Sequence, residues 1–190
     1  APLQLVDGYP HHLQQRFNGI KSDNFTWHFV DHHIAHAASA FIASPYTHAA
    51  VMTVDGRGEN VGTTYYHGKG NSLEKIGEVN VPHSLGLLYE AVTHHLGFLH
   101  SSDEYKVMAL ASYGRPAYVD EFRNMIRVHE NGQYTIDDLK LAERFGPKRL
   151  RNADFTEKHF DIAHSLQKVL EERMLELAIW LHGKTKEENL

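Results

Sequence analysis

The sequence predicts an α/β layer fold in which helices flank a central sheet. Short β-rich or apolar runs dominate the first part of the chain, and a helical period takes over after Pro82. The resulting order is strand, helix, three strands and then helices, which is typical of α/β layer folds. Residues 1–25 are polar and contain turn formers, so we expect an irregular lead-in followed by a folded unit over 26–190.

The first two predicted elements surround a group of histidines. "TWHFV", residues 26–30, alternates and is rich in β formers, which predicts a strand. "HIAHAASAFIA", residues 33–43, predicts a helix that ends at Ser44-Pro45. The residues expected on its apolar face are Ile34, Ala38, Phe41 and Ile42.

The next segment predicts a three-stranded meander. "AAVMTVDGRG", residues 49–58, is a short apolar run closing on Asp55-Gly56, which indicates a buried strand followed by a turn. "GTTYYHG" and "LEKIGEVNV", residues 62–68 and 73–81, are two further strands separated by glycine-rich turns.

Helices dominate the rest of the chain. Ser84 begins an amphipathic pattern that runs to Phe98. A second pattern, capped by Ser102 or Asp103, stops at Gly114. We further expect a helix near 118–127, a short strand at 133–136, a solvated basic loop at 146–152, and a long helix over 156–182 ended by Gly183.

Composition excludes several classes of function. The formal net charge is -5 and no long basic run occurs, so we expect no nucleic-acid partner. No apolar run approaches the roughly 20 residues needed to span a bilayer, and the first residues lack the pattern of a signal peptide. The chain has no cysteine, which fits a reducing compartment, and we expect a cytoplasmic protein.

The stretch "DHHIAHAASAF", residues 31–41, is a candidate metal-binding segment. His32 and His36 lie four residues apart, so a helix places both on one face, where they can share an ion. About one such pair is expected by chance among the 16 histidines, so surface polarity and helix packing remain alternatives. His33 competes with His32 as the ligand if the helix begins one residue later.

Asp55 is the candidate third ligand. It ends the apolar strand, and side chains at strand ends point into the crevice where open α/β folds bind ligands. Two imidazoles and a carboxylate leave coordination positions open for water or substrate. The alternative is an ordinary hairpin turn, because Asp-Gly is a common turn signal.

Four motifs together resemble a known family. "HHIAHAASAF..SPY", "VDGRGE", "SLGLLYEAVTHHLGF" and "DEYKVMALASYG" occur in the order found in carbamoyltransferases of the nodulation-factor and antibiotic type. That family includes the tobramycin and cephamycin enzymes. The last helix resembles the segment that follows these motifs, so the resemblance covers most of the chain.

The resemblance implies a fold, a reaction and its cofactors. The fold would be part of an actin/Hsp70-like (ASKHA) ATPase fold with a central mixed sheet. The parent protein would be an enzyme that uses ATP and carbamoyl phosphate, passes through carbamoyl-adenylate, and carbamoylates a hydroxyl of a sugar or antibiotic-like acceptor. A divalent metal, iron, would lie beside the nucleotide phosphates. A second copy of the chain is a further candidate partner.

The resemblance also assigns roles to residues. His32, His36 and Asp55 would hold the metal. Beyond the resemblance, we hypothesise that His36 orients the acceptor hydroxyl or accepts its proton. The Gly56-Arg57-Gly58 segment would face phosphate, with a plain hairpin as the alternative. Residues expected to contact the nucleotide from the "DEYKVM" motif are Glu104 and Lys106, with helix capping and a solvated lysine as alternatives.

The resemblance further implies that the chain is a fragment. We expect the opening strands of the fold, a further aspartate ligand and a glycine-rich nucleotide motif to lie outside it. Two rival functions follow from the residues themselves: a metal-dependent hydrolase, from the histidines and the aspartate, and a non-catalytic metal-binding or interaction module, from the truncation.

Overall fold

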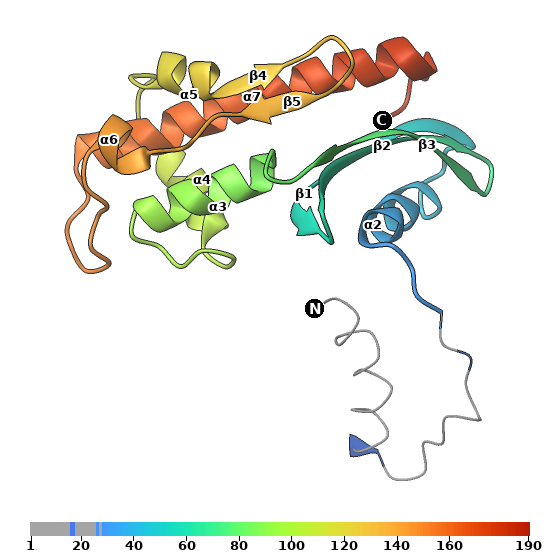
Figure 1. Ribbon diagram of the computed structural model, residues 1–190, viewed down its shortest axis with the longest axis horizontal. Coiled ribbons are helices and arrows are strands. Elements are labelled where there is room, and N and C mark those ends of the chain that lie inside the picture. Colours follow the sequence, from blue (N-terminus) through green and yellow to red (C-terminus); the bar gives the residue numbers. More distant parts are fainter. Residues whose placement is uncertain (1–15, 18–25, 27) are drawn as a thin grey trace.

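The computed structural model describes residues 16–17, 26 and 28–190 (Figure 1). The expected lead-in therefore lies almost entirely outside the described residues. The elements, in chain order, are α2 (His32–Phe41), β1 (His48–Gly58), β2 (Val61–Lys69), β3 (Ser72–Asn80), α3 (Leu85–His95), α4 (Glu104–Ala111), α5 (Val119–Met125), β4 (Ile126–Val128), β5 (Tyr134–Ile136), α6 (Leu141–Phe145) and α7 (Glu157–Thr185).

The predicted meander is confirmed, whereas the described residues form two small antiparallel sheets and no mixed sheet. Strands β1, β2 and β3 pair in that order and are antiparallel throughout, and β4 and β5 form a separate antiparallel pair. Short hairpins join these strands, whereas parallel neighbours need a crossover of a dozen or more residues. The expected helix near 118–127 ends earlier, because β4 begins at Ile126. The short helix α6 was not predicted.

The two faces of the meander pack against different helices. Along β1, Ala50, Met52 and Val54 face the larger core with α3 and α7, while Ala49 and Val51 face α2. This alternation follows from the two-residue period of a strand. Figure 1 shows α2 below the curved sheet and α7 running above it. The described residues therefore form two separate hydrophobic clusters, one on each side of the meander.

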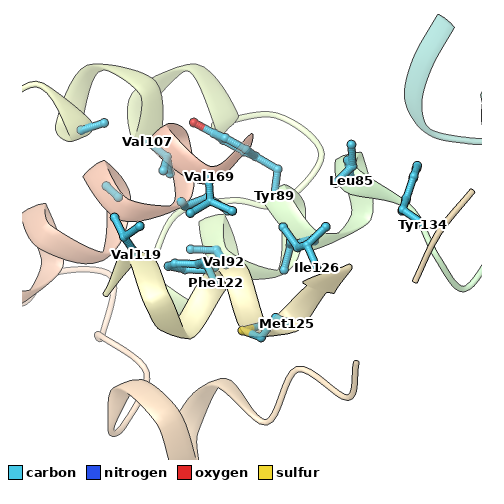
Figure 2. Close-up of a cluster of buried hydrophobic side chains, with 14 of the residues drawn as sticks. Leu85, Tyr89, Val92, Val107, Val119, Phe122, Met125, Ile126, Tyr134 and Val169 are labelled. Atoms are coloured by element: carbon cyan, nitrogen blue, oxygen red, sulfur yellow. The ribbon is translucent and has the colours of Figure 1, made fainter. Parts of the chain in front are cut away.

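The larger cluster is built by helices α3, α4, α5 and α7 (Figure 2). Val92, Phe122 and Val169 are fully buried at its centre. The amphipathic pattern of α7 is confirmed, but the helix passes through Gly183 and ends at Thr185. Lys186 adopts the left-handed conformation that terminates it and donates its backbone N–H to His182 O. No helix among the described residues is long and apolar enough to cross a membrane.

Helix α2 differs from its prediction in its inward face. It buries His33, Ala37 and Phe41, whereas Ile34 and Ile42 are 41% and 60% exposed. The small residues of α2 allow this helix to approach the sheet closely. Gly68 has no side chain, which leaves room on the sheet for the Phe41 ring.

The predicted strand at 26–30 is also wrong as far as the structure describes it. Thr26 and residues 28–30 have no strand conformation, and Phe29 and Val30 are more than 60% exposed. No described strand pairs with them, so β propensity alone does not form a strand here.

The basic loop at 146–152 is not simply solvated. Arg149 is only 6% exposed, and its guanidinium lies 3.8 Å from the centre of the Phe155 ring. A basic sequence predicts exposure on average, but a guanidinium can be buried when carbonyl oxygens and an aromatic face surround it.

Candidate metal centre

Helix α2 begins so that His32 and His36 point toward strand β1. Asp31 caps the helix, and its side chain accepts hydrogen bonds from the backbone N–H groups of His33 and Ile34 at 3.2 and 3.4 Å. The helix therefore starts at His32, one residue earlier than predicted. Residues four apart share a helix face, so the rings of His32 and His36 lie 4.6 Å apart, edge to face.

The two imidazoles converge on the carboxylate of Asp55. His32 Nε2 lies 2.6 Å from Asp55 Oδ2, His36 Nε2 lies 3.4 Å from the same oxygen, and the two Nε2 atoms are 3.0 Å apart. These three residues form the only group of at least three potential metal ligands found in the described part of the chain. All three side chains are partly open to solvent.

The arrangement fits a divalent cation. Once the two Nε2 atoms carry no proton, they and the Asp55 carboxylate present lone pairs to one small region, and a cation satisfies all three at once. Metal–ligand bonds of about 2.0–2.2 Å place neighbouring donor atoms roughly 3 Å apart, close to the separations seen here. Two histidines and one carboxylate are also the donor set of many non-haem iron(II) sites, which keep positions open for other ligands.

Asp55 reaches the histidines because β1 is irregular at this point. Val54 pairs with Thr63 and Gly58 with Val61, so three residues of β1 lie opposite Gly62 alone. The predicted turn at Asp55-Gly56 is therefore wrong, since the strand continues to Gly58. The extra residues form a bulge, a device that redirects side chains.

The start of α3 fixes the backbone of Asp55. Ser84 caps α3 by accepting from Leu87 N–H at 3.1 Å, and its hydroxyl lies 2.6 Å from Gly56 O and 3.0 Å from Asp55 O. Gly86 packs so tightly that an added Cβ would lie 2.6 Å from Asp55 O. Helix α3 thus holds the bulge from the side opposite α2.

Local interactions keep Asp55 ionised. Partial burial by itself raises the pKa of this carboxyl, but hydrogen bonds from His32 and from the backbone N–H of Gly56, together with the charges of His32 and His36, outweigh burial. The pKa of Asp55 therefore lies below its ordinary value. An ionised carboxylate is the form that binds a metal.

His33 does not compete with His32 at this site. It is 1% exposed and points into the sheet, where Nε2 donates to Val61 O at 2.8 Å. With the proton on Nε2, Nδ1 accepts from the Thr53 hydroxyl at 2.7 Å. Thr53 Oγ1 in turn lies 2.5 Å from Thr64 Oγ1. His33 therefore anchors α2 to the sheet, and His32 is the residue placed beside Asp55.

Gly58 makes room for the His32 ring. A Cβ built on Gly58 would lie 2.4 Å from His32 Cδ2 and 2.7 Å from His32 Cβ. Contacts this short do not occur, so any larger residue displaces the imidazole. The structure thus places Gly58 against the metal centre, while Gly56 and Arg57 lie elsewhere.

A cleft of about 840 Å³ adjoins the metal centre. Four of the predicted site residues line it: Asp55, Gly56, Arg57 and Glu104. Arg57 is exposed there, and the Glu104 carboxylate accepts the Ser101 N–H at 2.7 Å. Gly58 and Lys106 do not line the cleft, and the Lys106 ammonium instead pairs with Asp103 at 2.9 Å. Asp55 thus connects the metal centre to the cleft.

Sequence reasoning missed Glu90, which also lines this cleft. It accepts from Ser101 Oγ and contacts His100 Nδ1, each at 2.8 Å. The hydrogen bond from Ser101 is the main reason that the pKa of Glu90 is lowered. The spacing of Gly86 and Glu90, four residues apart on one helix face, is the signal that points to this residue.

The fold and site together define an α/β domain with a two-histidine, one-carboxylate centre beside a ligand-sized cleft. The sequence matches the family described as Carbamoyltransferase N-terminus over residues 13–190, and the chain belongs to this family.

Three curated relatives give further detail. The chain is 40% identical to an uncharacterized protein of Synechocystis over 177 residues, covering 85% of the chain and 29% of that protein. It is 36% identical to nodulation protein NolNO of Sinorhizobium fredii, covering 84% of the chain and 24% of NolNO. It is 34% identical to nodulation protein NolO of Bradyrhizobium diazoefficiens, covering 75% and 26% respectively. The chain thus spans about a quarter to three tenths of the length of these relatives.

Proposed function

We propose that this chain is part of an ATP-dependent O-carbamoyltransferase. In this proposal a carbamoyl group passes from carbamoyl phosphate, through carbamoyl-adenylate, to a hydroxyl of a sugar or antibiotic-like acceptor. The observation that carries the proposal is the convergence of His32, His36 and Asp55 at the edge of a cleft large enough for a nucleotide-sized ligand. Membership of the carbamoyltransferase family supports it.

We assign the metal to His32, His36 and Asp55, with iron(II) as the favoured ion because of the donor set. When bound, such an ion supplies positive charge that polarises phosphate or carbamoyl oxygens. His32 shares its Nε2 edge with the Asp55 carboxylate, which fixes the orientation of the ring. His36 is the most exposed of the three side chains, so it is the group that can orient the acceptor hydroxyl or take up its proton.

The cleft residues bind the nucleotide in this proposal. Arg57 is exposed at the cleft and provides a cationic fork for phosphate oxygens. The irregular backbone at Gly56 allows a ligand to approach the main chain closely, and Glu104 offers a carboxylate to ribose hydroxyls. Lys106 lies outside the cleft, so we assign it no nucleotide contact.

We also propose that residues 26–190 form part of an actin/Hsp70-like ATPase fold. Family membership and the three-stranded antiparallel meander followed by helix α3 support this proposal. Helices lie against both faces of the meander, as a layered domain requires.

The first test measures metal content and affinity in the purified protein. We expect stoichiometric iron or zinc in the unmodified protein and its loss in the His32→Ala/His36→Ala variant. His129→Ala is the matched control, because this exposed histidine lies in the β4–β5 hairpin far along the chain. Equal metal content in all three proteins would refute the assigned centre.

The second test measures the reaction in the full-length protein that contains this chain. ATP, carbamoyl phosphate and a polyol acceptor should yield a carbamate ester detectable by mass spectrometry, and Asp55→Asn should abolish it. Hydrolysis of a substrate without formation of a carbamate ester would favour a metal-dependent hydrolase. Such enzymes can bind their metal through the same histidine and carboxylate ligands. Metal binding without any nucleotide-induced stabilisation would favour a non-catalytic module.

A further inference from the structure

A second pocket lies at the opposite end of α3 from the metal centre. It has a volume of about 310 Å³, and its lining includes Lys106, Arg149 and Arg151. The start of α3 contacts Asp55, whereas its last turn leads into Gly97 at this pocket. Eleven helical residues span roughly 16 Å, so the two sites are separate.

Arg149 is the central side chain of this pocket. Its backbone N–H donates to His95 O at 3.0 Å, and its Nε donates to Leu96 O at 2.6 Å. Its Nη1 donates to Ala153 O. The guanidinium lies over the Phe155 ring. These contacts hold Arg149 at the C-terminal end of α3, where a cation favours the helix dipole.

The charge of Arg149 has no described counterion. The side chain is 94% buried, yet none of its hydrogen bonds or ion pairs in the described part of the chain involves a carboxylate. Burial therefore lowers the pKa of Arg149 without an opposing acid. Buried charges in proteins are normally paired, because removing an unpaired charge from water is unfavourable. Nη2 makes no hydrogen bond to a described residue and is not sealed from solvent.

The one acid that lines this pocket, Asp103, already has partners. Asp103 Oδ1 pairs with Lys106 at 2.9 Å, and Asp103 Oδ2 accepts the Leu99 N–H at 3.1 Å. Arg151 is exposed, and its charge acts on Asp103 from the rim. The three cations and one carboxylate that line the pocket leave a net charge of about +2.

We propose that this pocket binds the phosphate group of a small anionic ligand. Arg149 provides the free edge of its guanidinium, Arg151 closes over the ligand from the rim, and Lys106 supplies a further charge from α4. A dianionic phosphate neutralises the net positive charge of the pocket lining, whereas a single carboxylate neutralises only half of that charge. Planar guanidinium groups are also the side chains best suited to oxyanions.

A purely structural role for Arg149 does not account for the whole pocket. Capping of α3 uses only the backbone N–H and Nε of Arg149, while Nη1 binds Ala153 O in the following loop. Neither contact gives a reason for Arg151 and Lys106 to line the same pocket. The proposal does not rest on the carbamoyl-transfer chemistry proposed for the other site, since no residue is shared with the candidate metal centre or the larger cleft.

The experiment is a titration of the purified protein with inorganic phosphate, followed by calorimetry and ³¹P NMR in phosphate-free buffer. We expect one saturable site whose affinity falls as salt is raised. Arg151→Gln and Lys106→Gln should each weaken binding about tenfold, the usual effect of losing a charge-assisted hydrogen bond. Lys184→Gln removes an exposed cation from α7, far along the chain from the pocket residues, and should leave the affinity unchanged.

Two further arms make the result decisive. Arg149→Lys retains the charge but loses the fork, so it should weaken phosphate binding while circular dichroism shows a folded protein. Acetate should bind far more weakly than phosphate. Absence of saturable phosphate binding, equal weakening by Lys184→Gln, or equal affinity for acetate would each overturn the proposal. Metal content should stay unchanged in all these variants, which separates this site from the metal centre.

Discussion

Gly58→Ala is the sharpest test of how the fold builds the metal centre. The substitution adds one methyl group at a buried position of β1, directly against the His32 ring. It changes neither the charge nor any of the ligands. A loss of metal affinity in this variant would therefore come from displacement of His32 alone.

The size of that displacement follows from the contacts. The new Cβ would lie 2.4 Å from His32 Cδ2 and 2.7 Å from His32 Cβ, whereas ordinary carbon contacts begin near 3.4 Å. His32 must move by about 1 Å, and rotating the ring is not sufficient because its Cβ also clashes. Metal sites tolerate deviations of only about 0.2 Å in ligand distance. Overpacking of this kind also costs about 1–3 kcal/mol of stability.

The assay is a competition between the protein and a chelator for iron(II) or cobalt(II), together with thermal unfolding. We expect metal affinity to fall by at least tenfold and the melting temperature to drop by about 2–12 °C. Gly183→Ala is the control, since a Cβ there meets nothing within 4 Å and lies inside α7. That variant should gain up to about 1 kcal/mol of stability with unchanged metal affinity.

Wild-type metal affinity in a folded Gly58→Ala protein would refute the reasoning. It would mean that His32 does not need its observed position to bind the ion, and that the close packing of β1 on α2 has no role in the site.

Three other predictions concern the supports of the site and the core. His33→Leu removes the donor to Val61 O and one of the two partners of the Thr53 hydroxyl, so urea denaturation should show a loss of about 2–4 kcal/mol in the free energy of unfolding. The folded variant should keep its metal affinity, and a fall in that affinity would contradict the assignment of His32 as the ligand. Ser84→Ala removes the cap of α3 and its bonds to the bulge, and calorimetry should record a melting temperature about 3–6 °C lower. Burial, reinforced by nearby cations, lowers the pKa of His95 below 6.5, so the unfolded chain takes up a proton that the folded protein resists. The free energy of unfolding should therefore decrease as the pH falls from about 7 to 5, by up to about 1.4 kcal/mol per pH unit for this group, and His95→Gln should flatten the profile; an unchanged slope would exclude His95 as its source.

The parts of the fold that sequence predicts are those set by local periodicity. The meander follows from apolar strands joined by short turns, and α7 follows from its stripe of leucines and valines. Local periodicity does not predict which residues of α2 face the sheet. His33 is buried because Val61 O and Thr53 lie across the sheet to receive it, and both partners are 20 or more residues away.

In the candidate site, too, some features follow from local sequence and others depend on residues that are distant in the chain. Spacing alone places His32 and His36 on one helix face. The approach of Asp55 depends on a bulge whose register is set by β2, and the Asp-Gly signal predicts a turn that the structure does not contain. Lys106 lies two residues after Glu104, so the helical period turns it toward another pocket. Long-range packing decides these positions.

The candidate metal centre lies between the two hydrophobic clusters. Its histidines come from α2, which is held by the smaller cluster, whereas Asp55 comes from the strand that the larger cluster also supports. The smaller cluster contains few residues, so α2 is the element that opens most readily by local unfolding. A cation bound by ligands from both sides would stabilise the contact between α2 and the rest of the domain. At a hundredfold excess over its dissociation constant it adds about 2.7 kcal/mol to the cost of separating them. Amide hydrogen exchange in α2 should slow accordingly, while exchange in the centre of α7 stays as it was.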